Sequence, residues 1–355
     1  MSTRLLFRHL LSLVGLVFAS GLLLAAALLH PAPVIAQPLA ADLVEDGQLI
    51  DLTQDKYRQL FTELTQKYQF SQDELQTIFQ GQTINRQVLV LMDKQWEAKP
   101  YHQYALLFLT PGNIRDGKEK LRQHKALLNR IEATFGVDRE IVVAIWGVET
   151  RYGTSQGRFD VLRTLNTLFD AYPRRADFFR QQLIDFLLLC RETGRDPHGI
   201  MGSYAGAFGQ TQFIPASFRQ YAISFDGDDK RDVWESAPDV LASIAHYLKR
   251  YNWTLDAPIY AELGYTLQDP QLAAAEEKGR KALVPLDLVR RSQQLSLPPS
   301  PQNRPVSIVG LELKPGGPYT KRYVAGYPNF QAITEWNHSN RYAMAVTELA
   351  EALGR

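Results

Sequence analysis

The chain has almost no cysteine. Cys190 is the single one among 355 residues, so an internal disulfide is excluded. It lies in the apolar run DFLLLCRE, where a buried small hydrophobic residue is expected rather than a reactive thiol. The seven histidines show no spacing typical of a zinc site, and neither a phosphate-binding loop nor a Ser-His-Asp pattern stands out. We therefore expect no cofactor in catalysis.

The sequence also lacks an excess of charge of either sign. Its formal net charge is +1, with 22% charged and 45% hydrophobic residues, which is ordinary for a globular protein. Because no strongly basic face is required, nucleic acid is not expected as a partner. The length suffices for one large domain or two modest ones with a real hydrophobic core.

The N-terminus carries a long hydrophobic run. Arg4 and Arg8 precede an uncharged apolar stretch from Leu10 to Leu29, and small residues then lead to a cleavage position before Gln37. Residues 1–36 are therefore interpreted as a signal peptide or, because about 20 apolar residues span a bilayer, as an N-terminal membrane anchor. Either interpretation places an exported protein in the periplasm or cell envelope, where a hydrolase, lyase or envelope-binding protein is favoured.

Helical patterns dominate after a polar linker over residues 37–52. The stretch SQDELQTIFQG has Ser71 as N-cap and Glu74 three residues later, which predicts a capping box. KEKLRQHKALLNRIEATFG predicts one amphipathic helix that ends at Gly136. VDREIVVAIWGVET predicts a helix capped by Asp138, and because it is apolar nearly all round it should be buried in the core.

Strand patterns are confined to one late region. Residues 284–335 look strand-like in RPVSIVGLEL and RYVAGYPNFQAIT, which Pro/Gly turns separate. We predict a mainly α (α+β) fold in which this small β portion is inserted before the C-terminal helix.

One acid interrupts the apolar helix near its end. Glu149, in AIWGVETRYG, lies eleven residues after the predicted cap. Partial burial and the negative end of the helix dipole would both raise the pKa of this carboxyl. A carboxyl protonated near neutral pH is what a general acid needs. Alternatively, Glu149 forms an ordinary ion pair with Arg151 or caps a neighbour, and the stretch alone leaves both interpretations open.

A glycine-rich segment follows, MGSYAGAFGQTQFIPASF at residues 201–218. Glycines let the backbone approach a ligand closely. Tyr204, Phe208 and Phe213 offer flat apolar faces suited to sugar rings. Ser203, Gln210 and Gln212 offer neutral donors and acceptors for hydroxyl or N-acetyl groups. The alternative is a Gly/Ala-rich helix that packs closely against another helix.

Several motifs occur together in one order: AIWGVETRYG, YPRRADFF, MGSYAGAFGQTQFIPASF, FDGDDKRDVWES and EWNHSNRYAMAV. With them the chain resembles the membrane-bound lytic murein transglycosylase B family over about residues 55–353. The resemblance implies a catalytic domain over 53–355 with a lysozyme-like core at about 100–255. It implies cleavage of the β-1,4 bond between N-acetylmuramic acid and N-acetylglucosamine in peptidoglycan glycan strands, with a 1,6-anhydromuramic end and no water. Other cell-wall enzymes are further partners to consider.

The resemblance also assigns roles to residues. Glu149 matches the family's single catalytic glutamate, which acts first as acid and then as base. Ser203 and Gln212 match polar neighbours of that glutamate, and Arg174 and Arg175 match a pair that meets the lactyl carboxylate or peptide stem; a solvated helix start is their alternative. Tyr104 matches an aromatic residue of the cleft, and Asn337 and Tyr342 match further cleft residues. Trp336 stands where relatives often have Tyr, so a hydroxyl contact is lost there although the ring can still stack on sugar.

Two other functions compete with the lytic transglycosylase. One is a hydrolytic muramidase that admits water, and the other is a non-catalytic peptidoglycan-binding scaffold that retains the cleft. A pure binding protein would have no need of a protonated carboxyl, which argues against the scaffold.

The stretch SFDGDDKRDVWE has the length of a calcium-binding loop. Read as an EF-hand loop, its ligand positions are Ser224, Asp226, Asp228, Lys230 (through its carbonyl), Asp232 and Glu235. Position 1 is Ser rather than Asp, and position 6 is Asp229 rather than Gly. The sequence thus leaves two interpretations open, a weak structural Ca²⁺ site or an acidic surface turn before the next helix.

Overall fold

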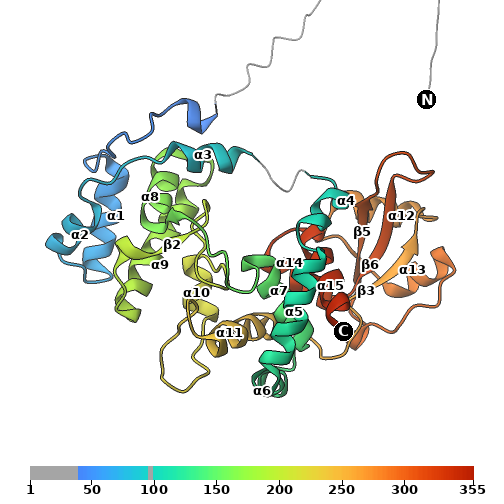
Figure 1. Cartoon of the computed structure of the whole chain (residues 1–355). Coiled ribbons are helices and arrows are strands. Elements are labelled where there is room, and N and C mark those ends of the chain that lie inside the picture. The colour runs from blue at the N-terminus through green and yellow to red at the C-terminus, as the bar shows by residue number, and fades with distance from the viewer. Residues whose placement is uncertain (1–38, 95–98) are drawn as a thin grey trace, which may run out of the picture. The chain divides into compact units, whose positions relative to one another are not determined.

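The computed structural model describes residues 39–94 and 99–355 (Figure 1). The segment 1–36, expected as a signal peptide or anchor, lies outside them. Within the described ranges, no helix is both long and apolar enough to cross a bilayer. The helices are α1 Asp55–Gln66, α2 Gln72–Phe79, α3 Arg86–Asp93, α4 Tyr101–Tyr104, α5 Pro111–Gln123, α6 Lys125–Phe135, α7 Arg139–Thr150, α8 Val161–Ala171, α9 Ala176–Thr193, α10 Pro215–Tyr221, α11 Ala237–Arg250, α12 Pro270–Lys278, α13 Leu286–Gln293, α14 Pro328–Trp336 and α15 Asn340–Leu353.

The other elements of the described residues are shorter. Because helices predominate, the prediction of a mainly α fold is confirmed. The 3₁₀ helices are η1 Ala40–Asp42, η3 Ala105–Leu107, η4 Pro173–Arg175, η5 Pro197–Gly199 and η6 Pro301–Asn303. The strands are β1 Phe159–Asp160, β2 Met201–Gly202, β3 Tyr260–Gly264, β4 Leu283–Val284, β5 Val306–Glu312 and β6 Lys321–Gly326.

The larger sheet is antiparallel and has the strand order β3-β6-β5-β4. Successive side chains of a strand point to opposite faces, and the two faces of β5 enter different hydrophobic clusters. Val306 and Ile308 pack in a cluster with residues of α12 and α13, whereas Val309 and Leu311 join the main helical core. The sheet is thus attached through one face to the helices that surround α7.

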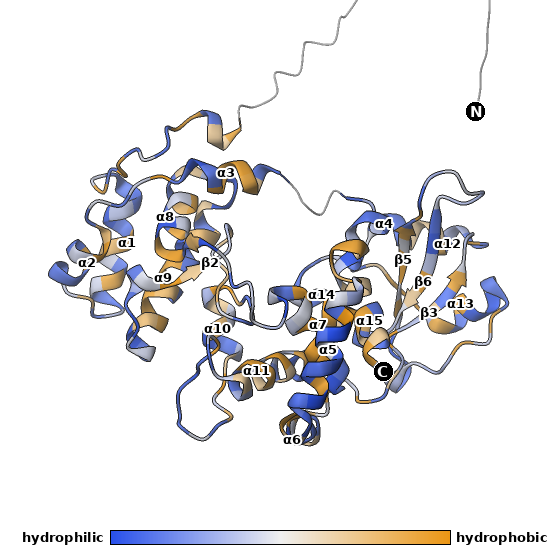
Figure 2. Cartoon of the chain, in the orientation of Figure 1, coloured by the Kyte–Doolittle hydropathy of each residue, from blue (hydrophilic) through white to orange (hydrophobic). Residues whose placement is uncertain are grey.

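Helix α7 is buried along most of its length, as its apolar sequence predicts. Residues Ile141 to Gly147 are all buried, and α5, α6, α11 and α15 pack around the helix. Figure 2 shows α7 largely in the hydrophobic colour, whereas the neighbouring α5 carries many hydrophilic residues. The helix ends where Arg151 and Tyr152 adopt left-handed backbone conformations, with φ of 48° and 59°. Its last turn, which carries Glu149, is therefore the one that leaves the core.

The predicted ends of two helices are confirmed in part. Ser71 and Glu74 form the predicted capping box at the start of α2. Asp138 occupies the N-cap position of α7, but its side chain makes no capping hydrogen bond. Its carboxylate instead accepts hydrogen bonds from Trp253 Nε1 at 2.7 Å and from Arg355 Nε at 2.9 Å.

Three expectations were wrong in their boundaries. The single helix expected up to Gly136 is two helices, α5 and α6, which meet at His124. The β portion expected over 284–335 starts earlier, at β3, and residues 328–336 form α14 because Pro328 suits the first turn of a helix. Part of the linker expected over 37–52 packs on the domain, since Ala40, Ala41 and Ile50 are buried.

Candidate active site

The carboxylate of Glu149 is held by two side chains from the C-terminal helices. Its Oε1 accepts a hydrogen bond from Trp336 Nε1 on α14 at 2.8 Å and another from the Tyr342 hydroxyl on α15 at 2.6 Å. Two consecutive C-terminal helices thus reach one oxygen atom of α7, with donors 187 and 193 residues away in the sequence. The last turn of α7 supplies the acid, and the C-terminal helices supply both donors.

The environment of Glu149 keeps its proton near neutral pH. Burial raises the pKa of this carboxyl to about 7, although the hydrogen bonds from Tyr342 and Trp336 favour the charged form. Among the described residues no ion pair joins Glu149 to Arg151, so that alternative is wrong. The buried phenol of Tyr342 has a pKa raised well above 10, chiefly by burial and then by Glu149, so it stays a donor.

The second oxygen, Oε2, has a different surrounding. Within the described ranges Oε2 accepts no hydrogen bond. It is also not one of the fully buried polar atoms without a partner, so part of its surface is accessible. Glu149 as a whole is only half-buried. Oε2 is therefore the atom of Glu149 that is open to an incoming molecule.

Trp336 completes an aromatic wall beside Glu149. Its ring packs against Phe213, with ring centroids 5.0 Å apart, and against Tyr247 at 4.6 Å. Sequence reasoning treated Trp336 as the loss of a hydroxyl contact and missed that its indole N–H is a donor to the acid. Tyr104 on α4 lies near Tyr342, since its charge contributes to the raised pKa of that phenol.

The glycine-rich segment is a loop between β2 and α10, so the packed-helix alternative is wrong for its three glycines and their neighbours. Ser203 Oγ accepts hydrogen bonds from the backbone N–H groups of Ala205 at 3.3 Å and Ala207 at 3.1 Å. Gln212, with a left-handed φ of 49°, donates from Nε2 to the carbonyl of Gly209 at 2.9 Å. Both predicted ligand-binding side chains thus stabilise the loop through hydrogen bonds to its own backbone.

Other predicted sugar-contacting residues of this loop serve its packing. Gln210 Oε1 accepts from Trp146 Nε1 at 2.9 Å, and its Nε2 donates to the carbonyl of Trp234 at 2.7 Å. Phe208 and Phe213 are buried at 0% and 2% exposure, so the expectation that they offer open faces to sugar rings is wrong. Tyr204 is half-buried.

The remaining predicted residues lie in separate surroundings. Arg174 Nη2 pairs with Asp93 Oδ1 at 2.6 Å, and the guanidinium of Arg175 lies over the Phe178 ring, 4.2 Å from its centroid. No contact in the described chain joins either arginine to Glu149. Asn337 is half-buried directly after α14, and its carbonyl accepts the Ser339 N–H.

The acidic loop brings together only part of its predicted ligand set. Carboxylate oxygens of Asp226, Asp228 and Asp239 lie within 4.8 Å of one another. Asp239, from the first turn of α11, was missed because it lies outside the twelve residues that the sequence indicated as the loop. Asp232 is turned away, since its Oδ1 accepts the backbone N–H of Trp234 at 2.9 Å and pairs with Arg195.

Glu235 is likewise outside this three-aspartate cluster. The Ser224 hydroxyl and the Lys230 carbonyl stay predicted ligands. Lys230 uses its backbone N–H to bind Asp228 Oδ1 at 2.9 Å, and Glu235 is exposed. The EF-hand order of ligands therefore stays a prediction for this loop, and only Asp226 and Asp228 of that order lie in the cluster.

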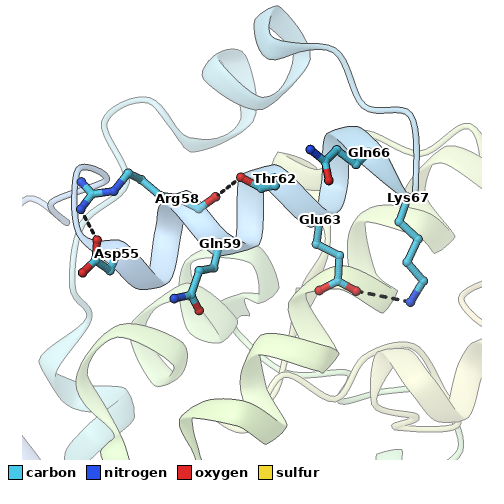
Figure 3. A pocket seen from close by; sticks show the side chains of 7 residues that line it. All are labelled: Asp55, Arg58, Gln59, Thr62, Glu63, Gln66 and Lys67. Atoms are coloured by element: carbon cyan, nitrogen blue, oxygen red, sulfur yellow. Dashed lines mark hydrogen bonds and ion pairs between the residues drawn. The ribbon is translucent and has the colours of Figure 1, made fainter.

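A surface hollow of about 520 Å³ runs along α1 but lacks the chemistry of a site (Figure 3). Its lining comes from α1 and the residue that follows it: Asp55, Arg58, Gln59, Thr62, Glu63, Gln66 and Lys67. The charged side chains are already paired, Arg58 with Asp55 and Lys67 with Glu63. In the described structure none of them contacts Glu149, so the candidate active site is the convergence of α7, α14 and α15.

The chain is similar to known proteins in sequence and in fold. Residues 53–351 match a family model described as "Transglycosylase SLT domain". Membrane-bound lytic murein transglycosylase B of Escherichia coli (strain K12) is 34% identical over 319 residues, which is 83% of this chain and 82% of that protein.

Two solved structures are also similar. The Escherichia coli lytic transglycosylase Slt35 in complex with calcium is 33% identical, with a TM-score of 0.73 over 88% of this chain and 96% of that one. SltB3 from Pseudomonas aeruginosa in complex with NAG-anhNAM-pentapeptide is 31% identical, with a TM-score of 0.69 over 84% and 79%.

The raised pKa predicts that Glu149 destabilises the folded protein above neutral pH. The folded state holds this proton up to about pH 7, whereas the unfolded chain releases it near 4.5. The contribution of Glu149 to stability is thus complete below about 4.5 and falls as pH rises to 7. We expect Glu149→Gln to gain about 2–3 kcal/mol relative to wild type between pH 4.5 and 8, measured by urea unfolding.

A matched control is Glu119→Gln. Arg122 lowers the pKa of the Glu119 carboxyl, so removal of this acid should give no gain in stability as pH rises. An unchanged difference between wild type and Glu149→Gln over the same pH range would show that Glu149 ionises freely.

Proposed function

Because the chain belongs to the lytic transglycosylases that share the SLT domain, we propose that it cleaves the β-1,4 bond between N-acetylmuramic acid and N-acetylglucosamine in peptidoglycan. Glu149 is the acid and base of this reaction, and the product carries a 1,6-anhydromuramic end. The observation that carries the proposal is the half-buried carboxyl of Glu149, with two donors on Oε1 and a pKa of about 7.

The two donors decide where the proton of Glu149 resides. An N–H and an O–H both point at Oε1, so the proton of the neutral carboxyl belongs on Oε2, the open atom. Oε2–H protonates the glycosidic oxygen, the bond from that oxygen to C1 of the muramic acid breaks, and the N-acetylglucosamine end leaves as an alcohol. Oε1 meanwhile keeps its two hydrogen bonds, which stabilise the negative charge left on the carboxylate.

The second half of the reaction reverses the proton transfer. Oε2, now unprotonated, removes the proton of the muramyl 6-hydroxyl. The oxygen of that hydroxyl forms the new bond to C1. Glu149 ends protonated as it began, so one group completes the cycle and no water is consumed. Glycosidases that use water employ two carboxylates at a defined separation. In the described chain no second acid contributes to the pKa of Glu149, which supports the one-carboxyl route.

A solved relative supports the proposed product. SltB3 has been crystallised in complex with NAG-anhNAM-pentapeptide, a fragment with an anhydro muramic residue. The hydrolytic muramidase and the non-catalytic scaffold remain the competing functions, and product analysis separates all three.

Digestion of purified peptidoglycan should release muropeptides with anhydromuramic ends, seen by mass spectrometry as 18 Da below their hydrated forms. Glu149→Gln should lower the rate by at least about 10³-fold, because the amide cannot donate the acid proton, while sacculus binding persists. Reducing muramic ends would instead identify a hydrolase. Equal inertness of wild type and variant, with binding retained, would identify the scaffold.

We propose further that the loop before α11 binds Ca²⁺ for structural support. Calcium takes carboxylate oxygens, and three of them lie within 4.8 Å of one another, from Asp226 and Asp228 in the loop and from Asp239 in α11. Hydrogen bonds from Ser236 and from the loop backbone lower the pKa of Asp226, so this ligand is charged at neutral pH. The ion would take no part in the reaction of Glu149. It would instead hold the 224–235 segment on α11.

Addition of Ca²⁺ should raise the unfolding temperature of the protein. A tenfold excess over Kd stabilises by about 1.4 kcal/mol through linkage. Asp228→Asn should abolish this shift. Glu235→Gln, which changes an exposed acid of the same loop outside the cluster, should retain it. Loss of the shift in both variants would favour the EF-hand ligand order, and no shift in wild type would remove calcium from the account.

We propose that the protein acts on glycan strands in the periplasm or cell envelope. The support is the N-terminal apolar segment in the sequence and a relative whose name describes it as membrane-bound.

A further inference from the structure

The first turn of α15 is tied to the sheet by one carboxylate. Glu312, the last residue of β5, accepts a hydrogen bond on Oε2 from Arg341 Nε at 3.1 Å, and its Oε1 accepts from Arg341 Nη2. This is the two-bond geometry in which arginine holds a carboxylate most rigidly. Arg341 directly precedes Tyr342, the residue whose hydroxyl donates to Glu149.

The same carboxylate also holds the start of α4. Glu312 Oε2 accepts the backbone N–H of Tyr101 at 3.0 Å. The Tyr101 hydroxyl in turn donates to Glu348 on α15 at 2.6 Å, and Arg322 of β6 pairs with Glu348 at 2.7 Å. Because Tyr104 follows Tyr101 by one helical turn, Glu312 anchors both segments that carry the tyrosines near the acid.

We propose that Glu312 is a positioning residue for Glu149: its grip on Arg341 keeps the Tyr342 hydroxyl in hydrogen-bond contact with Oε1. The inference rests on the proposed role of Glu149 and gives the sheet a part in the reaction. Glu312 touches no reacting atom and acts through Arg341 and Tyr342.

Magnitudes separate this role from a merely structural one. The side chains of Glu312 and Arg341 are each 30% exposed, and an ion pair so placed contributes about 1 kcal/mol or less to folding. A displacement of about 1 Å at a catalytic group can cost about 100-fold in rate. Removal of Glu312 should therefore affect the reaction far more than the stability of the fold.

The test is a double-mutant cycle on the full chain with a soluble glycan substrate. Glu312→Ala should lower kcat about tenfold or more with KM changed less than about threefold. It should also move the alkaline limb of the pH–rate profile upward, because loss of the phenol donor disfavours the anion of Glu149. Tyr342→Phe should show the same two changes. Added to Tyr342→Phe, Glu312→Ala should change kcat by less than about twofold.

Glu276→Ala is the matched control. Glu276 pairs with Lys321 at 2.8 Å, and Lys321 lies opposite Glu312 in the sheet, so the substitution removes a neighbouring ion pair. It should leave kcat and the pH profile unchanged. Glu312→Gln keeps the shape and one acceptor, so it should fall between wild type and Glu312→Ala. It also serves in the cycle if the alanine variant does not fold.

Effects of Glu312→Ala and Tyr342→Phe that multiply would overturn the proposal, as would a loss of stability with kcat and pH profile unchanged. Failure of the proposed function has a different signature. Glu149→Gln would then cleave as fast as wild type, whatever the variants of Glu312 do.

Discussion

The arrangement of two donors on one oxygen of Glu149 determines how the rest of the site can work. A half-buried carboxyl without them would face only the cost of desolvation and would stay neutral to high pH. With them, the pKa of Glu149 is about 7, so the group can lose and regain its proton near neutrality. The same two contacts leave Oε2 as the atom that exchanges the proton. One carboxyl can thus serve as acid and then as base.

The fold provides this arrangement by joining distant parts of the chain. The apolar surface of α7 fixes the acid at the point where the helix leaves the core. The donors come from α14 and α15, which follow the sheet in sequence. A contact from β5 holds the start of α15 at Arg341, and one from β6 holds the helix further along, at Glu348. The β portion, which looked like an insertion, is therefore part of the support of the active site.

Local patterns of sequence predicted the acid but not its partners. Glu149 stands out because an apolar helix with a charged residue in its last turn implies burial and a raised pKa. The donors Trp336 and Tyr342 are 187 and 193 residues away, so only the folded chain shows that both reach one oxygen. Burial of Phe208 and the recruitment of Asp239 depend on packing between segments in the same way. The sequence predicted several of the helical segments. It did not predict the break at His124 between α5 and α6, which depends on tertiary contacts.

The most direct test of the central claim is titration of Glu149 itself. Carboxyl-¹³C glutamate labelling, with the spectrum of Glu149→Gln used to assign the resonance, follows this one group as pH changes. The account predicts an apparent pKa of about 7 in wild type and a higher value in Tyr342→Phe. A resonance that titrates near the ordinary value of 4.5 would contradict it, because Glu149 would then hold no proton to donate at neutral pH.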